Sequence, residues 1–156
     1  MVKTWKQDVV IQAPIEQVSH YFEGGLAERQ KIMPNVTKHE PVAVTEKTVG
    51  SVYRQAYQKG NRTEEYDVHI TEYYNSCENK RLEEKYILGG IFEITTRYEL
   101  EKLDESKVQM TYTMTNKPLK WYVKPFLFFA SHKVVDTFVK VVKTVAEQET
   151  AAERIN

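Results

Sequence analysis

The sequence predicts an α+β domain in which a curved, seven-stranded antiparallel sheet wraps around a long C-terminal helix, with two short helices after the first strand. One observation is the C-terminal segment, whose apolar residues from Leu127 to Ala146 fall on one wide arc of a helix that extends to about Ala152. The other is a change of the apolar period to two between Val36 and Pro118, which is typical of strands with one face in solvent. Helix and sheet each need a large apolar partner, so we expect them to cover one another.

The elements are separated by residues that stop helices or form turns. Pro14 suits the first turn of a short helix, and Gly24-Gly25 ends it. Pro34 ends a second short helix. Turn-forming pairs such as Gly60-Asn61 and Gly89-Gly90 separate later strands, which gives consecutive hairpins. The expected strands span 3–12, 37–45, 50–59, 62–73, 80–88, 91–102 and 107–116, and the short helices lie within 14–23 and 26–33.

The length and composition predict one domain covering residues 1–156, large enough to bury a core without disulfides or metals. The formal net charge is +0 and no run of Lys or Arg stands out, so we expect no nucleic acid partner. Cys77 is the only cysteine, which excludes an internal disulfide and fits a reducing, cytoplasmic setting. The start of the chain lacks the apolar run of a signal peptide, and the apolar stretch 121–130 is too short to span a bilayer.

Five short segments carry a family resemblance through their order along the chain: Val10–Val18, Met33–Val36, Val49–Tyr53, Tyr66–Tyr73 and Phe138–Glu147. With them, all 156 residues resemble the helix-grip superfamily often labelled SRPBCC, which groups START lipid-transfer domains, birch-pollen-allergen-like proteins and polyketide cyclases. The resemblance implies a cavity between the sheet and the C-terminal helix that holds an apolar or amphipathic small molecule. It implies no conserved catalytic set.

Two departures narrow the resemblance to a branch of that superfamily. The glycine-rich loop of the plant allergen-like proteins is missing between residues 45 and 62, where Gly50 and Gly60 stand alone. The Trp-containing pattern of the homologues that activate the heat-shock chaperone ATPase is also missing. The chain looks most like the bacterial polyketide cyclase-like or general ligand-binding branch.

Strand alternation and the helical arc select the candidate ligand-binding residues. Tyrosine hydroxyls in such a cavity would orient an aromatic or polyketide-like ligand, and the alternative is that these tyrosines are ordinary core and strand residues. The candidates are Tyr53, Tyr66, Val68, Glu84, Tyr86, Ile94, Tyr98, Met110, Tyr112, Phe128, His132 and Val135.

Two candidates are titratable and have a second interpretation. If Leu82 and Tyr86 face inward, Glu84 does too, where it must be paired, protonated or wetted and could serve as a general acid or base. We favour the alternative, a register shift or bulge that turns Glu84 outward. His132 lies at the edge of the apolar arc, where it would bond either a ligand or, as we favour, a local partner.

Cofactor and metal chemistry are not expected. The other histidines, His20, His39 and His69, have no spacing that would make a metal site with His132. No nucleophile motif, phosphate-binding loop or dinucleotide fingerprint is present, so we expect no cofactor and assign no residue a catalytic role.

The sequence therefore favours a monomeric or weakly dimeric protein that binds or carries a hydrophobic small molecule without catalysis. The alternative is a polyketide cyclase-, aromatase- or dehydratase-like enzyme that uses Glu84, Tyr98, Tyr112 or His132. A third hypothesis is a protein-interaction module in the aromatic segment 121–129, where Trp121, Phe126 and Phe129 could also touch a membrane transiently. The competing interpretation of this segment is burial under neighbouring loops after a break at Pro125.

Overall fold

Seven strands form one antiparallel sheet in the order β1-β7-β6-β5-β4-β3-β2 in the computed structural model, which describes residues 2–121 and 131–155. All seven expected strands are confirmed, and their ends differ from the prediction by no more than two residues. The strands are β1 (Lys3–Ile11), β2 (Val36–Ala43), β3 (Val52–Lys59), β4 (Arg62–Asn75), β5 (Asn79–Leu88), β6 (Phe92–Asp104) and β7 (Lys107–Pro118). The helices are α1 (Ile15–Glu23), α2 (Leu26–Ile32) and α3 (His132–Ile155).

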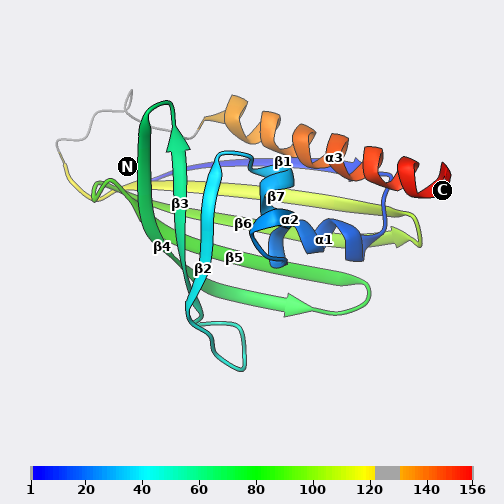
Figure 1. The fold of residues 1–156 in the computed structure, drawn as a ribbon, viewed down its shortest axis with the longest axis horizontal. Coiled ribbons are helices and arrows are strands. Elements are labelled where there is room, and N and C mark those ends of the chain that lie inside the picture. Colours follow the sequence, from blue (N-terminus) through cyan, green and yellow to red (C-terminus); the bar gives the residue numbers. More distant parts are fainter. Residues whose placement is uncertain (1, 122–130, 156) are drawn as a thin grey trace.

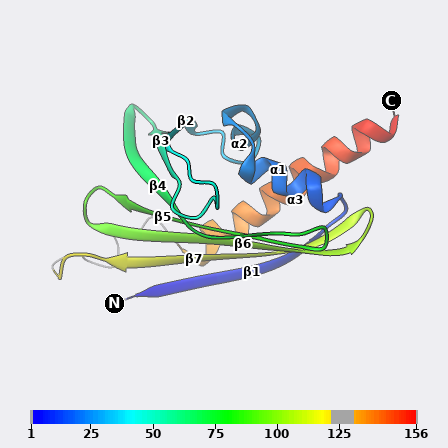
Figure 2. The same cartoon turned by 90° about the horizontal axis from the view of Figure 1, so that it is seen from below.

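All three helices lie on the concave side of the curved sheet (Figures 1 and 2). Strands β1 and β2 are its two edges, and α1 and α2 carry the chain from one edge to the other. Pro41 lies in β2, where an edge strand tolerates a residue without an N–H group. This arrangement is the expected α+β fold.

The predicted alternation places the core on the concave face. In β6 and β7, Tyr98 pairs with Tyr112 and Leu100 with Met110, and all four side chains are buried. The facing stripe of α3 consists of Val135, Val139, Val142 and Ala146, which are also buried and recur at helical spacing. Burial of these two apolar surfaces against each other stabilises the grip of the sheet on the helix.

The start of α3 differs from the prediction. The helix begins at His132 and not at Leu127, because Ser131 acts as its N-cap. The Ser131 hydroxyl accepts the N–H of Val134 at 3.2 Å, and its carbonyl accepts the N–H of Val135 at 3.1 Å. Residues 122–130 lie outside the described residues, so the predicted helical phase of that segment remains a prediction.

Close contacts fix α1 and α2 against their neighbours. A Cβ on Gly24, between the two helices, would lie 2.7 Å from the His20 carbonyl oxygen, so only glycine fits this joint. The Gln17 amide donates to the Ala146 carbonyl at 3.0 Å, and the Tyr21 hydroxyl donates to Glu149. These bonds hold α1 on α3 and, through the glycine joint, set the position of α2.

In the part of the chain that is described, no helix is long and apolar enough to cross a membrane.

Candidate functional site

Two cavities lie on the concave side of the sheet, and they differ in their linings. The first, which we name the aromatic cavity, has a volume of about 240 Å³ and the second about 190 Å³. The aromatic cavity is lined by Arg29, Ile32, Met33, Pro34, Asn35, Val36, Gln55, Tyr57, Tyr66, Val68, Glu84, Tyr86, Thr96, Tyr112, Met114, Val134 and Phe138. The second cavity is lined by Phe22, Glu23, Gly24, Arg29, His39, Thr48, Tyr53, Ile70, Tyr73, Leu82 and Glu84.

Paired rings form much of the aromatic cavity. Tyr66 stacks on Tyr86 with ring centroids 4.7 Å apart, and Tyr112 packs against Phe138 of α3 at 4.6 Å. Burial raises the pKa of the Tyr86 and Tyr112 hydroxyls well above the usual value for tyrosine. Both phenols therefore stay neutral at physiological pH, and they can act as hydrogen-bonding groups on an otherwise apolar wall.

A buried ion pair joins α2 to the centre of the sheet. The Arg29 guanidinium donates to both carboxylate oxygens of Glu84, through Nη1 at 3.3 Å and Nη2 at 3.4 Å. Nη2 also donates to the Phe22 carbonyl at 2.7 Å. Arg29 is 3% exposed and Glu84 6% exposed, so each charge offsets the desolvation cost of the other.

The inward position of Glu84 corrects the interpretation we favoured from the sequence. Strand β5 pairs with β6 without a register shift from Asn79 to Leu88, so its side chains keep strict alternation. The irregularity lies in the neighbouring strand β4, between Ile70 and Glu72. Glu84 thus faces the cavities, where Arg29 supplies the partner that makes its burial tolerable.

The ion pair lies between the two cavities. Arg29 and Glu84 are the residues that the two linings share. The third nitrogen of the guanidinium, Nε, is buried and has no hydrogen-bond partner among the described residues. A buried donor without an acceptor is costly, and it marks a place where a ligand or water oxygen would be favourable.

A chain of hydrogen bonds runs beside the pair from the second cavity to the aromatic cavity. His39 Nδ1 bonds Gln55 Oε1 at 2.9 Å, and Gln55 Nε2 donates to the Tyr66 hydroxyl at 2.9 Å. Burial, aided by the charge of Arg29, lowers the pKa of His39 to about 4. His39 is therefore neutral at pH 7, and because Gln55 presents an oxygen to it, the ring proton is on Nδ1.

Comparisons with known proteins support the fold. No family model and no curated protein matches the chain. Among solved structures, a START superfamily protein from Mycobacterium smegmatis matches with a TM-score of 0.69 and 11% identity, over 98% of this chain and 99% of that one. The lipid transfer and protein localization domain of human StarD13 matches with a TM-score of 0.68 and 15% identity, over 93% and 77% of the two chains. The Zhui aromatase/cyclase from Streptomyces sp. R1128 matches with a TM-score of 0.62 and 13% identity, over 98% and 89%.

The chain has the helix-grip fold of START-like proteins. At these identities the likeness is one of fold, and the residues of the site have to be taken from this chain alone. In this helix-grip protein the curved sheet and α3 leave the aromatic cavity between them, with α2 as a side wall.

The site residues predicted from the sequence lie in different parts of the helix-grip fold. Five of them line the aromatic cavity: Tyr66, Val68, Glu84, Tyr86 and Tyr112. Tyr53 lines the second cavity, whereas Ile94, Tyr98, Met110 and Val135 are packed in the core outside both linings. His132 is exposed at the first turn of α3 and belongs to neither lining, and Phe128 lies outside the described residues. Whether any of them binds a ligand stays a prediction.

Many lining residues were not among those predicted from the sequence, and Arg29, His39, Gln55 and Phe138 are the ones that make the contacts described above. A signal for Arg29 was present, because it lies three residues after Leu26 and three before Ile32, on the same face of a helix. Phe138 belonged to the predicted apolar arc of α3 but was not assigned to the site. His39 was considered only as a metal ligand, and its stacking on Tyr53, with ring centroids 4.8 Å apart, has no sequence signal.

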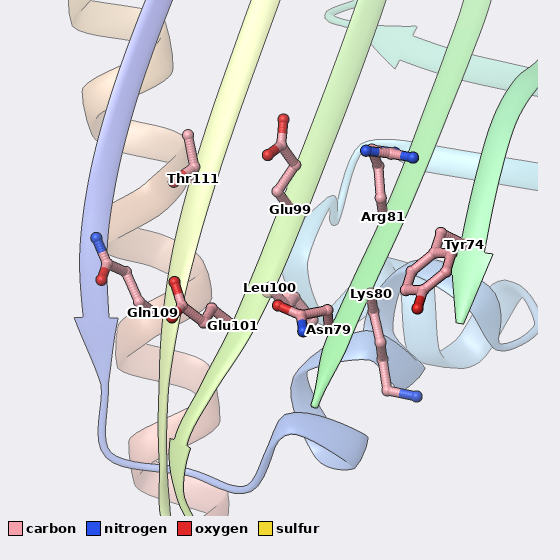
Figure 3. A pocket seen from close by; sticks show the side chains of 9 residues that line it. All are labelled: Tyr74, Asn79, Lys80, Arg81, Glu99, Leu100, Glu101, Gln109 and Thr111. Carbon is pink, nitrogen blue, oxygen red and sulfur yellow. The ribbon is translucent and has the colours of Figure 1, made fainter. Parts of the chain in front are cut away.

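A larger hollow of about 370 Å³ lies on the opposite, convex face of the sheet (Figure 3). Arg81, Glu99 and Thr111 project into it from neighbouring strands, and each alternates with an inward-facing residue of the core. Its lining is mostly charged or amide-bearing, which suits water better than an apolar ligand: Tyr74, Asn79, Lys80, Arg81, Glu99, Leu100, Glu101, Gln109 and Thr111.

Two further expectations concern metals and membranes. Within residues 2–121 and 131–155, no group of three His, Cys, Asp or Glu side chains could hold a metal ion. Trp121 is 95% exposed, whereas Phe126 and Phe129 lie outside the described residues. Membrane contact through these three residues stays a prediction.

Proposed function

We propose that this protein binds an apolar or amphipathic small molecule in the aromatic cavity and acts as a carrier or binding module. The observation that carries the proposal is a cavity of about 240 Å³ between sheet and helices, walled by Tyr66, Tyr86, Tyr112 and Phe138. An apolar wall with a few polar groups of fixed orientation is the usual composition of a small-molecule site. The lipid transfer domain named among the similar structures is in keeping with this proposal.

The state of the titratable groups supports binding over catalysis. Both carboxylate oxygens of Glu84 accept hydrogen bonds from Arg29, so this carboxylate is not free to act as a base. Tyr98 stacks on Phe22 at 3.9 Å within the core and does not line either cavity. The buried tyrosine hydroxyls have raised pKa values and are poor bases near pH 7.

An aromatase- or cyclase-like enzyme is the second candidate, favoured by the hydrogen-bonded chain from His39 through Gln55 to Tyr66. Such a chain holds a hydroxyl in a fixed direction in the aromatic cavity, where it could orient a substrate carbonyl. One of the similar structures is named an aromatase/cyclase. If this candidate is right, Tyr66→Phe removes turnover of a bound polyketide-like substrate while leaving its binding nearly unchanged.

Cavity filling tests the binding proposal. A panel of straight-chain alcohols, amides and fatty acids and of naphthalene derivatives is screened by thermal shift and by native mass spectrometry. The variant Val68→Phe places a ring in the aromatic cavity, because Val68 is buried and lines it. The matched control, Val10→Phe, adds the same ring to β1 at an exposed position.

We expect the panel to contain compounds that raise the melting temperature of the wild type and of Val10→Phe but do not raise that of Val68→Phe. A wild-type protein that binds nothing in the panel, or a Val68→Phe variant that binds as well as the wild type, would contradict the proposal. The cytoplasmic setting expected from the single cysteine remains part of the same hypothesis.

A further inference from the structure

We propose that the Arg29–Glu84 pair selects the charge of the ligand: the part of the molecule that meets the pair is uncharged and offers a hydrogen-bond acceptor to Arg29. This inference rests on the proposed binding function and adds the chemical class of the ligand. Uncharged acceptors of this kind include ketones, esters, amides and ethers. Three features of the buried pair support it.

The first feature is the position of the pair between two small cavities. Each cavity, at about 240 Å³ and 190 Å³, is smaller than the roughly 300–1,000 Å³ of sites for drug-sized ligands. A ligand that fills both cavities has to pass the two side chains that their linings share, Arg29 and Glu84. The polar part of an amphipathic ligand is therefore most favourably placed at the pair.

The second feature is the charge balance of the two linings. Arg29 and Glu84 neutralise each other at 3.3 Å, and His39 is held neutral by burial and by the charge of Arg29. Of the other lining residues that the structure describes, Glu23 is the one that carries a charge, at an exposed position where it accepts a hydrogen bond from Tyr73. A carboxylate ligand would thus bury a second anion beside Glu84 with no further cation among the described residues of either lining, which is costly.

The third feature is the unpartnered donors. Both terminal nitrogens of the Arg29 guanidinium are bonded, whereas its buried Nε–H has no acceptor among the described residues. Nearby, the Tyr66 hydroxyl accepts a hydrogen bond from Gln55, which leaves its own hydrogen for another acceptor. These two groups, at the pair and beside it, are donors, and a neutral oxygen satisfies them without adding charge.

Matched pairs of neutral and anionic probes test the inference in the wild-type protein. The amide 2-naphthamide and the carboxylate 2-naphthoate have nearly the same shape, as do decanamide and decanoate. Dissociation constants are measured by isothermal titration calorimetry at pH 7.5. We expect each amide to bind at least about tenfold more tightly than its carboxylate. A carboxylate that binds as tightly as its amide would overturn the inference while leaving the proposed function intact, and a protein that binds none of the probes would overturn both.

The variant Glu84→Gln provides the sharper test. It keeps the shape of the side chain but leaves Arg29 without its counter-ion, so the preference should reverse and the carboxylates should bind more tightly than the amides. The matched control is Glu83→Gln, the preceding residue of β5, which faces the convex side and bonds Thr71 and Arg97. We expect the wild-type preference in this control.

A Glu84→Gln variant that still prefers the amides would overturn the inference. The same protein should gain thermal stability from 2-naphthoate, because that ligand replaces the missing carboxylate, whereas the wild type should not. If Glu84→Gln does not fold, the comparison of amides with carboxylates in the wild type decides alone.

Discussion

Arg29 on α2 bonds both carboxylate oxygens of Glu84 on β5, the central strand of the sheet. A helix of seven residues has little stability of its own, so contacts such as this one and the glycine joint to α1 fix where α2 lies. The pair is also the wall between the two cavities. The strength of the pair should therefore affect the stability of the fold and, under the proposed function, the binding of a ligand.

Removing one partner of this pair should be far more harmful than removing both. Arg29→Met or Glu84→Leu leaves a buried charge unpaired, and we expect each to lower the free energy of unfolding by about 3–5 kcal/mol. The double variant should recover most of that loss. Urea denaturation measures the three values, with Asp67→Asn in the exposed Arg54–Asp67 pair as a control that should change little. Additive losses in the double variant would show that the two charges do not stabilise each other.

The half-buried His39 should make stability depend on pH. Its pKa is lowered to about 4 in the folded protein and is about 6.5 in the unfolded chain, so the unfolded state binds the additional proton between these values. Stability should then fall as the pH is lowered from about 6.5 to about 4, by roughly 1–2 kcal/mol after solvent screening. Denaturation curves of the wild type and of His39→Gln across this range measure the effect. A His39→Gln variant with the same slope as the wild type would refute the assignment.

The start of α3 depends on the hydroxyl of Ser131. Because this hydroxyl accepts the N–H of Val134, Ser131→Ala should lower the free energy of unfolding by about 1 kcal/mol. Ser131→Asp retains an acceptor and should remain close to the wild type. Thermal and urea denaturation provide the measurement, and an unchanged Ser131→Ala variant would argue against the N-cap.

The contact of α1 with α3 should depend on Tyr21. Its hydroxyl accepts from Gln17 at 2.9 Å and donates to Glu149, so Tyr21→Phe leaves both groups without this partner and should cost about 1–3 kcal/mol. Lys31→Met removes the more exposed bond from Lys31 to Glu149 and should cost less. Equal losses in the two variants would mean that the hydroxyl has no special part in holding α1 on α3.

The strands could be predicted because their signals are local. One signal is the alternation of Phe92, Ile94, Tyr98 and Leu100, and another is the glycines at the turns. Both lie within a few residues along the chain, and together they determine the pairing register of the strands and the face of the sheet on which each side chain lies. The start of α3 was misplaced because a single serine sets it at the end of an apolar segment, and hydrophobic periodicity does not detect a cap.

The interior of the site could be predicted only in part. Alternation gave an inward Glu84 as one of two possibilities, but the residue that makes this position tolerable, Arg29, is 55 residues away. Likewise, inward facing does not distinguish Tyr98, which stacks on Phe22 in the core, from Tyr86, which faces the aromatic cavity. Residues packed in the core and residues that line a cavity follow the same strand alternation. Only the positions of α1, α2 and α3 decide which of the inward-facing side chains are packed and which face a cavity.

The most direct test of ligand binding in the aromatic cavity is an NMR measurement of contacts between the tightest-binding compound of the panel and the ¹³C-labelled tyrosine rings. We expect nuclear Overhauser effects from the ligand to Tyr66, Tyr86 and Tyr112, which line that cavity. Contacts to Tyr74 instead, in the hollow on the convex face, or contacts to no tyrosine ring, would contradict the account.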